Sequence, residues 1–86
     1  MLFRIDYSVD GSNVPAAQER FAKMDAKGDG LNLLGRWHEA GNKGFMIVEA
    51  EDMVSVGTFC HQWSDLCDLN AVPLMTDEQV GQILSA

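Results

Sequence analysis

The segment from residue 31 to residue 51 constrains the fold most, because it contains two strand-like runs joined by a very short connection. Residues 31–39 and 44–51 are rich in apolar and aromatic side chains. The connection between them, Ala40-Gly41-Asn42-Lys43, includes the Gly and Asn that tight hairpins favour. We therefore expect the two strands to pair antiparallel.

The N-terminal part of the chain predicts a strand followed by a helix. Residues 2–9 alternate mainly apolar with mainly polar side chains, which is the period of two of a half-buried strand, so the odd-numbered residues should face a helix layer. Asn13 can cap the helix that follows, and Pro15 fits its first turn because the missing N–H is not needed there. The apolar stripe extends this helix to about Ala26.

The C-terminal part predicts a second helix, a fourth strand and a short last helix. Asp52 can cap a helix whose apolar residues recur at spacings of three and four as far as Cys67. Residues 69–75 are typical of a short strand. Thr76 and Gln79 then match a capping box, which opens the last helix.

The resulting order, β-α-β-β-α-β-α, predicts an α+β fold of the ferredoxin-like type, with one four-stranded antiparallel sheet and helices on one of its faces. We expect residues 1–86 to form one such domain. The other sheet face would be left bare, and a chain of this size has a thin core. Two copies packing these faces together would solve both problems, which predicts a homodimer of the dimeric α/β-barrel type.

The composition argues against several classes of partner. Thirteen acidic residues against six basic ones give a formal charge of −7, which repels nucleic acids and anionic membranes. No apolar run approaches the roughly 20 residues of a membrane span, and the first residues do not resemble a secretion signal. We therefore expect a cytoplasmic protein that binds neither nucleic acid nor membrane.

The two cysteines, Cys60 and Cys67, fall in the same predicted helix, about 10 Å apart along its axis, which is too far for a disulfide. Reduced thiols are the simpler interpretation. The spacings of Cys and His do not match a zinc site, so no metal is predicted.

Polar residues on the expected helix-free face suggest a binding site. If the apolar sets of the strands face the helices, the opposite face gathers Arg4, Asp6, Arg36, His38, Phe45, Ile47 and Glu49. In this cleft His38 could transfer a proton, with Asp6 or Glu49 as its carboxylate partner. Arg4 and Arg36 could hold an anionic oxygen, and Phe45 and Ile47 would supply apolar contacts.

Two alternatives remain open at this point. The same polar residues could form salt bridges at the dimer interface or a solvated sheet face. The strand over residues 31–39 also has an uncertain register, because a one-residue bulge would exchange Trp37 with His38.

A helix histidine, His61, near Trp63 raises the possibility of haem ligation. Trp63 lies on the apolar stripe and His61 flanks it, where it can pair with Asp65 four residues later. No cofactor is therefore predicted.

The segments LLGRWH, GFMIVEAED, QWSDL and VPLMTDEQ, which occur in this order, resemble a family of small, mainly bacterial proteins known only as domain-of-unknown-function family 3303. The resemblance covers almost the whole chain. The family looks like a member of the dimeric α/β-barrel superfamily, which includes quinol-forming monooxygenases, muconolactone-type isomerases and haem degraders. This likeness implies a fold and not a reaction. Where the haem degraders use an asparagine, the first strand here offers Asp6, which argues against haem cleavage.

The sequence therefore predicts a homodimer that binds a small organic molecule in a cleft on the helix-free sheet face. One alternative is a structural or regulatory dimer without catalysis. Another is a cofactor-free monooxygenase or isomerase that uses His38 with Asp6 or Glu49 as an acid/base pair.

Overall fold

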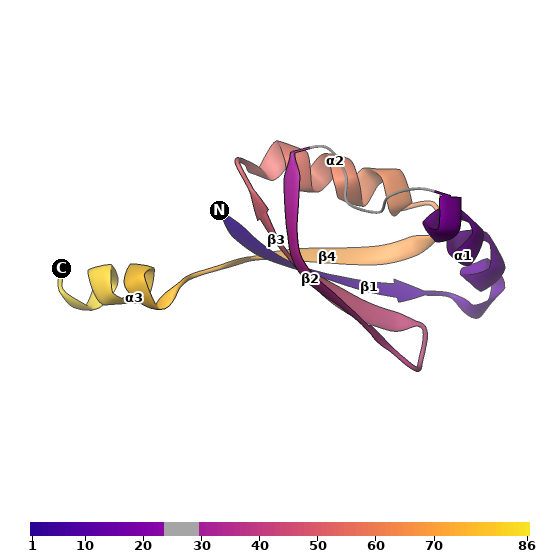
Figure 1. Ribbon diagram of the computed structural model, residues 1–86, viewed down its shortest axis with the longest axis horizontal. Coiled ribbons are helices and arrows are strands. Elements are labelled where there is room, and N and C mark those ends of the chain that lie inside the picture. The colour runs from indigo at the N-terminus through magenta and orange to yellow at the C-terminus, as the bar shows by residue number, and fades with distance from the viewer. Residues whose placement is uncertain (24–29) are drawn as a thin grey trace.

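The computed structural model describes residues 1–23 and 30–86, and Figure 1 shows how the elements are arranged. Along the chain they follow the predicted order of strand, helix, strand, strand, helix, strand and helix, with a 3₁₀ turn before the first helix. The elements are β1 (Leu2–Val9), η1 (Gly11–Asn13), α1 (Val14–Lys23), β2 (Leu31–Glu39), β3 (Lys43–Ala50), α2 (Met53–Trp63), β4 (Cys67–Leu74) and α3 (Asp77–Leu84).

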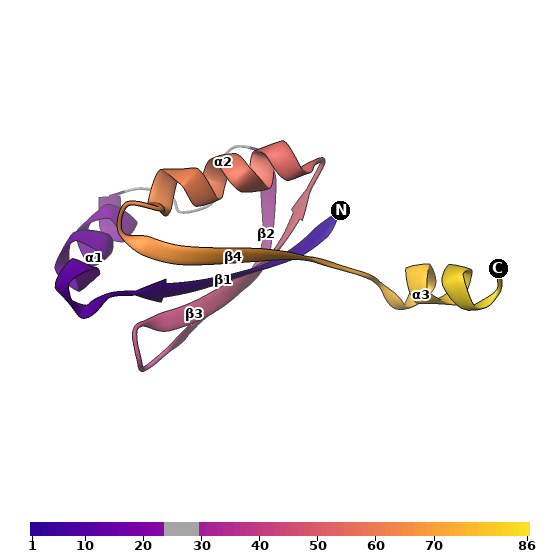
Figure 2. The same ribbon diagram turned by 180° about the vertical axis from the view of Figure 1, so that it is seen from behind.

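The strands form a four-stranded antiparallel sheet in the order β2-β3-β1-β4, so β1 and β3 lie at its centre. α2 lies over one side of this sheet, and α1 lies beyond the end of β1, next to one end of α2 (Figure 1 and Figure 2). A central hairpin between two helical crossovers is the ferredoxin-like arrangement. The predicted fold class is confirmed.

The hydrophobic core lies between the sheet and α2. Phe3 and Ile5 of β1, Val48 of β3 and Val56 of α2 are completely or almost completely buried. Every second side chain of a strand points to the same face, so the alternation in residues 2–9 directs Phe3 and Ile5 toward the helices, as predicted. Each such side chain contributes about 1.5–3 kcal/mol to stability through its burial.

A bulge in β2 interrupts the hairpin. Leu33 pairs with Val48, but the next pair is Gly35 with Ile47, so Leu34 is an extra residue in β2. A one-residue insertion of this kind turns all of the following side chains to the opposite face of the sheet.

The bulge overturns the expected faces of the second half of β2. Arg36 pairs with the buried Met46 and points, like His38, to the side of the helices. Trp37 pairs with Phe45 on the other side, where the two rings stack with centroids 5.2 Å apart. The prediction that Arg36 and His38 face away from the helices is therefore wrong.

α2 is shorter than predicted. It ends at Trp63, and the chain then turns, with the backbone N–H of Leu66 donating to the Trp63 carbonyl at 3.0 Å. Cys67 begins β4 instead of extending the helix, which also corrects the expected strand start at Leu69. Cys60 and Cys67 are free thiols on different elements, and burial raises the pKa of each.

Two predicted helix caps are confirmed. The Asp52 side chain accepts a hydrogen bond from the backbone N–H of Ser55 at 2.9 Å, which caps α2. Thr76 and Gln79 form the reciprocal capping box of α3. These bonds satisfy backbone N–H groups that have no partner within the helix itself.

The first helix starts differently from the prediction. Asn13, the expected cap, lies in η1, and its side-chain amide donates to the Leu66 carbonyl at 3.4 Å. The predicted end of this helix near Ala26 lies outside the described residues.

α3 extends away from the other elements beyond the end of β4 (Figure 1). Its apolar residues Val80, Ile83 and Leu84 are exposed, so α3 adds nothing to the core. Within residues 1–23 and 30–86, no helix is both long enough and apolar enough to cross a membrane.

Candidate functional site

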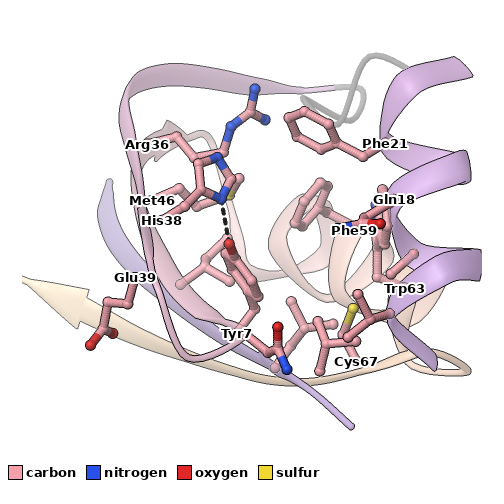
Figure 3. Close-up of a pocket in the computed structure, with 16 residues that line it drawn as sticks. Tyr7, Gln18, Phe21, Arg36, His38, Glu39, Met46, Phe59, Trp63 and Cys67 are labelled. Carbon is pink, nitrogen blue, oxygen red and sulfur yellow. Dashed lines mark hydrogen bonds between the residues drawn. The ribbon is translucent and has the colours of Figure 1, made fainter. Parts of the chain in front are cut away.

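A cavity of about 430 Å³ lies between the sheet and its covering helices, on the side of the sheet that carries α1 and α2 (Figure 3). Most of its wall is apolar and comes from both layers. The apolar lining residues are Ile5, Val9, Val14, Ala17, Phe21, Met46, Phe59, Trp63 and Leu69.

The position of α1 at the edge of this cavity is fixed by Arg20. Its two terminal nitrogens each donate to one carboxylate oxygen of Asp65 at 2.8 Å, and Nη1 also donates to the Gln62 carbonyl at 3.0 Å. Hydrogen bonding from Arg20 lowers the pKa of the Asp65 carboxyl. Bidentate pairing of this kind fixes orientation as well as distance, so it holds α1 against the C-terminal end of α2.

Tyr7 of β1 and His38 of β2 form a hydrogen-bonded pair across the cavity wall, between the Tyr7 hydroxyl and His38 Nδ1 (Figure 3). Burial raises the pKa of Tyr7, so the phenol keeps its proton at neutral pH. In the arrangement where the hydroxyl donates to Nδ1, the other ring nitrogen, Nε2, carries a proton, and His38 presents this N–H as a donor at the cavity.

Gly44 makes this pairing possible. β3 lies between β1 and β2, and Gly44 pairs with Tyr7 on one side and with His38 on the other. A methyl group at Gly44 would lie 2.5 Å from Tyr7 Cε1 and 2.5 Å from the Trp37 carbonyl oxygen. The missing side chain therefore leaves the space through which the Tyr7 ring crosses β3 to reach His38.

Arg36 supplies the permanent positive charge of the site. Its guanidinium carbon lies 4.7 Å from the centroid of the Phe21 ring, and the same ring meets the His38 ring edge-on at 5.7 Å. Arg36 Nη1 is buried and has no hydrogen-bond partner among residues 1–23 and 30–86. A buried N–H of a cation without an acceptor is costly, so an anion that accepts a hydrogen bond from this atom would be stabilised in the cavity.

The structure brings only two of the seven predicted site residues into the cavity, namely Arg36 and His38. The other five lie on the helix-free face of the sheet, which the register assigns to the side opposite α1 and α2. They are Arg4, Asp6, Phe45, Ile47 and Glu49.

On the helix-free face, Arg4 and Asp6 partner each other. Arg4 Nε donates to Asp6 Oδ1 at 3.0 Å, and the Arg4 guanidinium lies 4.2 Å from the centroid of the Phe45 ring. The sheet separates His38 from both Asp6 and Glu49. The predicted imidazole–carboxylate pair is therefore replaced by the Tyr7–His38 pair.

Sequence reasoning missed Tyr7, Gly44, Phe21 and the cavity-lining residues of α2 as parts of the site. Tyr7 was expected to face the helices, and it does, but its contact with His38 depends on a glycine in the strand between them. A glycine at the start of β3 was visible in the sequence, although its alignment with both residues depends on the register of two strand pairs. In the described residues, no cluster of His, Cys, Asp and Glu is suited to a metal ion.

Comparison with protein families gives one finding. The profile of the domain of unknown function DUF3303 matches residues 1–86. The chain belongs to this family. A comparison with curated proteins gives no match. Membership of the DUF3303 family carries no activity with it, so the function must be argued from the cavity.

Proposed function

We propose that this DUF3303 protein binds a small, largely apolar organic molecule in the cavity between its sheet and its helices. The observation that carries the proposal is the cavity itself, whose volume of about 430 Å³ suits an organic ligand. Apolar walls with a few polar groups at one position are typical of small-molecule sites. Tyr7, Arg36 and His38 form that polar group here.

The proposed site is on the opposite face of the sheet from the one expected from the sequence. The bulge at Leu34 moves Arg36 and His38 to the helix side, and the cavity lies there with them. The expected kind of ligand and the site residues Arg36 and His38 are therefore retained, but the proposed site lies on the helix side of the sheet.

A fluorescence titration with N-phenyl-1-naphthylamine tests the proposal, because this neutral probe brightens in apolar surroundings. Ala17 of α1 lines the cavity, so we expect Ala17→Phe to fill the space and abolish binding. The matched control is Ala16→Phe on the exposed side of the same helix, which should bind like the natural protein. Lack of binding by the natural protein, or equal binding by Ala17→Phe, would refute the proposal.

We further propose that the protein is a homodimer joined through the helix-free face. This face exposes Trp37 of β2 by 54% and Val72 of β4 by 41%, and Phe45 and Ile47 of β3 lie on the same face between these edge strands. Exposed apolar side chains across a sheet face are typical of an interface. A second copy is the favoured partner because the Arg4–Asp6 pair beside them presents both charges, so the same surface can complement itself across a two-fold axis.

Analytical ultracentrifugation of Trp37→Glu tests this interface. We expect the variant to dissociate at concentrations where the natural protein is dimeric, because it buries a charge in the interface. Val54→Glu, on an exposed side chain of α2, is the control and should leave the dimer intact. A dimer without N-phenyl-1-naphthylamine binding would favour the structural or regulatory alternative.

An enzyme that uses an imidazole–carboxylate pair has less support, because the sheet separates His38 from Asp6 and Glu49. The cytoplasmic location expected from the composition stays a prediction.

A further inference from the structure

We propose that the ligand of this cavity is an apolar monoanion, with one carboxylate or similar oxyanion bound by Arg36 and an apolar body that lies against Phe59 and Trp63. This inference rests on the proposed function, since it names the chemical class of molecule that the cavity accepts.

The unpartnered Nη1 of Arg36 is the first argument. The guanidinium carbon lies 4.7 Å from the centroid of the Phe21 ring, and this cation–π contact gives the N–H groups no oxygen or nitrogen acceptor. Nη1 is nevertheless buried, and no acceptor meets it within the described residues. Buried polar groups in native proteins have partners, so an acceptor from outside the described chain is expected. A carboxylate matches the donor geometry of an arginine best.

His38 provides a second donor on the same side. It lies two residues after Arg36 on β2, and both point into the cavity from the helix side of the sheet. Tyr7 occupies Nδ1, and Figure 3 shows the other ring nitrogen on the Arg36 side of the imidazole. An oxyanion at Arg36 can therefore accept from the guanidinium and from His38 Nε2–H.

The charge of the lining limits the ligand to one anionic group. Among the lining residues that the structure describes, Arg36 carries the only permanent positive charge, and Glu39 adds a negative one. A second carboxylate of the ligand would lose its hydration in the cavity without pairing with another positive charge, which is strongly unfavourable. The remaining wall, including Phe59, Trp63 and Met46, favours an apolar body.

Displacement of N-phenyl-1-naphthylamine by three competitors tests the inference. The competitors are 2-naphthoate, its neutral analogue 2-naphthamide, and the dianion naphthalene-2,6-dicarboxylate, which share one ring system. We expect 2-naphthoate to displace the probe at a concentration at least tenfold lower than either of the others. Equal displacement by the acid and the amide would overturn the inference and leave the proposed function standing, whereas failure of the probe to bind would overturn the proposed function.

Variants of Arg36 and Arg4 test whether the preference for 2-naphthoate depends on Arg36. Arg36→Gln should remove the preference for 2-naphthoate over 2-naphthamide. Arg36→Lys keeps the positive charge but loses the planar pair of N–H donors, so it should retain part of this preference. Arg4→Gln, on the helix-free face, is the matched control and should leave the preference unchanged. An undiminished preference in Arg36→Gln, with a melting temperature that shows it is folded, would refute the role of Arg36.

Discussion

Replacement of Gly44 by alanine tests the geometry that joins the three strands at the cavity. The added methyl group would lie 2.5 Å from Tyr7 Cε1 and 2.5 Å from the Trp37 carbonyl oxygen. Both distances are about 1 Å shorter than an ordinary van der Waals contact. The Tyr7 ring can swing away, but the Trp37 carbonyl belongs to the backbone of β2 and cannot move without disturbing the hairpin.

The expected size of the effect follows from two opposing contributions. Overpacking of a well-packed site costs about 1–3 kcal/mol. Replacing a strand glycine by alanine recovers about 0.4–1 kcal/mol, because the unfolded chain has fewer conformations to lose. From the middle of each range, the balance is a destabilisation of about 1.3 kcal/mol. In a domain of this size this lowers the melting temperature by roughly 5–10 °C.

Thermal unfolding followed by circular dichroism measures this shift. Gly41→Ala is the matched control, because nothing lies within 4 Å of its added methyl group and its melting temperature should be almost unchanged. In a Tyr7→Ala background the cost of Gly44→Ala should fall by at least about 0.5 kcal/mol, since one of the two clashes is gone. If Gly44→Ala melts like the natural protein, the Tyr7 ring does not cross β3 and the described pairing is incorrect.

Three further predictions concern stability. Val56 is 0% exposed, so Val56→Ala should lower the free energy of unfolding, measured in urea, by about 2 kcal/mol. Val54 on the same helix is 74% exposed, so Val54→Ala should lower it by less than about 0.5 kcal/mol. Equal effects of the two changes would contradict the placement of α2. Burial raises the pKa of Tyr7 from 10.0, so the contribution of the protonated hydroxyl to stability is present below pH 10 and is lost as the pH rises further. The difference in unfolding free energy between the natural protein and Tyr7→Phe should therefore shrink between pH 8 and pH 11. A constant difference would refute the burial of the hydroxyl. Hydrogen bonding to the backbone of Ser55 lowers the pKa of Asp52, so Asp52→Ala should lower the melting temperature at pH 7. The difference in melting temperature between the natural protein and the variant should disappear as the pH falls below 3.8. A difference that persists at pH 2 would exclude the charged cap as its cause.

Local signals in the sequence were sufficient for most of the fold. The alternation of residues 2–9 identified Phe3 and Ile5 as core, because the period of two depends only on neighbouring residues. The caps at Asp52 and Thr76 were also predictable, since each involves a side chain and a backbone group three residues apart. Features that depend on a few consecutive residues are visible without tertiary information.

The candidate site was harder to predict, because it depends on strand register. Leu34 is an ordinary strand residue in the sequence, and the neighbouring Gly35 is a residue that often marks a bulge without showing which residue is the extra one. The bulge was recognised as an alternative, but choosing it required the pairing of β2 with β3. Once Arg36 and His38 change faces, their neighbours change from Asp6 and Glu49 to Tyr7 and Phe21.

The end of α2 illustrates a different limit. Cys67 continued the helical spacing of apolar residues, so the pattern alone favoured a longer helix. In the structure the same residue is buried as the first residue of β4, where it pairs with Val9. An apolar side chain at that position satisfies either arrangement, and tertiary pairing decides between them.

The central claim, that a ligand enters the space between the sheet and its helices, is tested most directly by nuclear Overhauser effects from bound N-phenyl-1-naphthylamine to isoleucine δ1 methyl groups. Ile5 lines the cavity, Ile47 lies on the helix-free face and Ile83 lies on α3, so these methyl groups report three separate surfaces. We predict cross-peaks from the naphthyl protons to Ile5 and none to the other two. Cross-peaks to Ile47 or Ile83 without one to Ile5 would contradict the account.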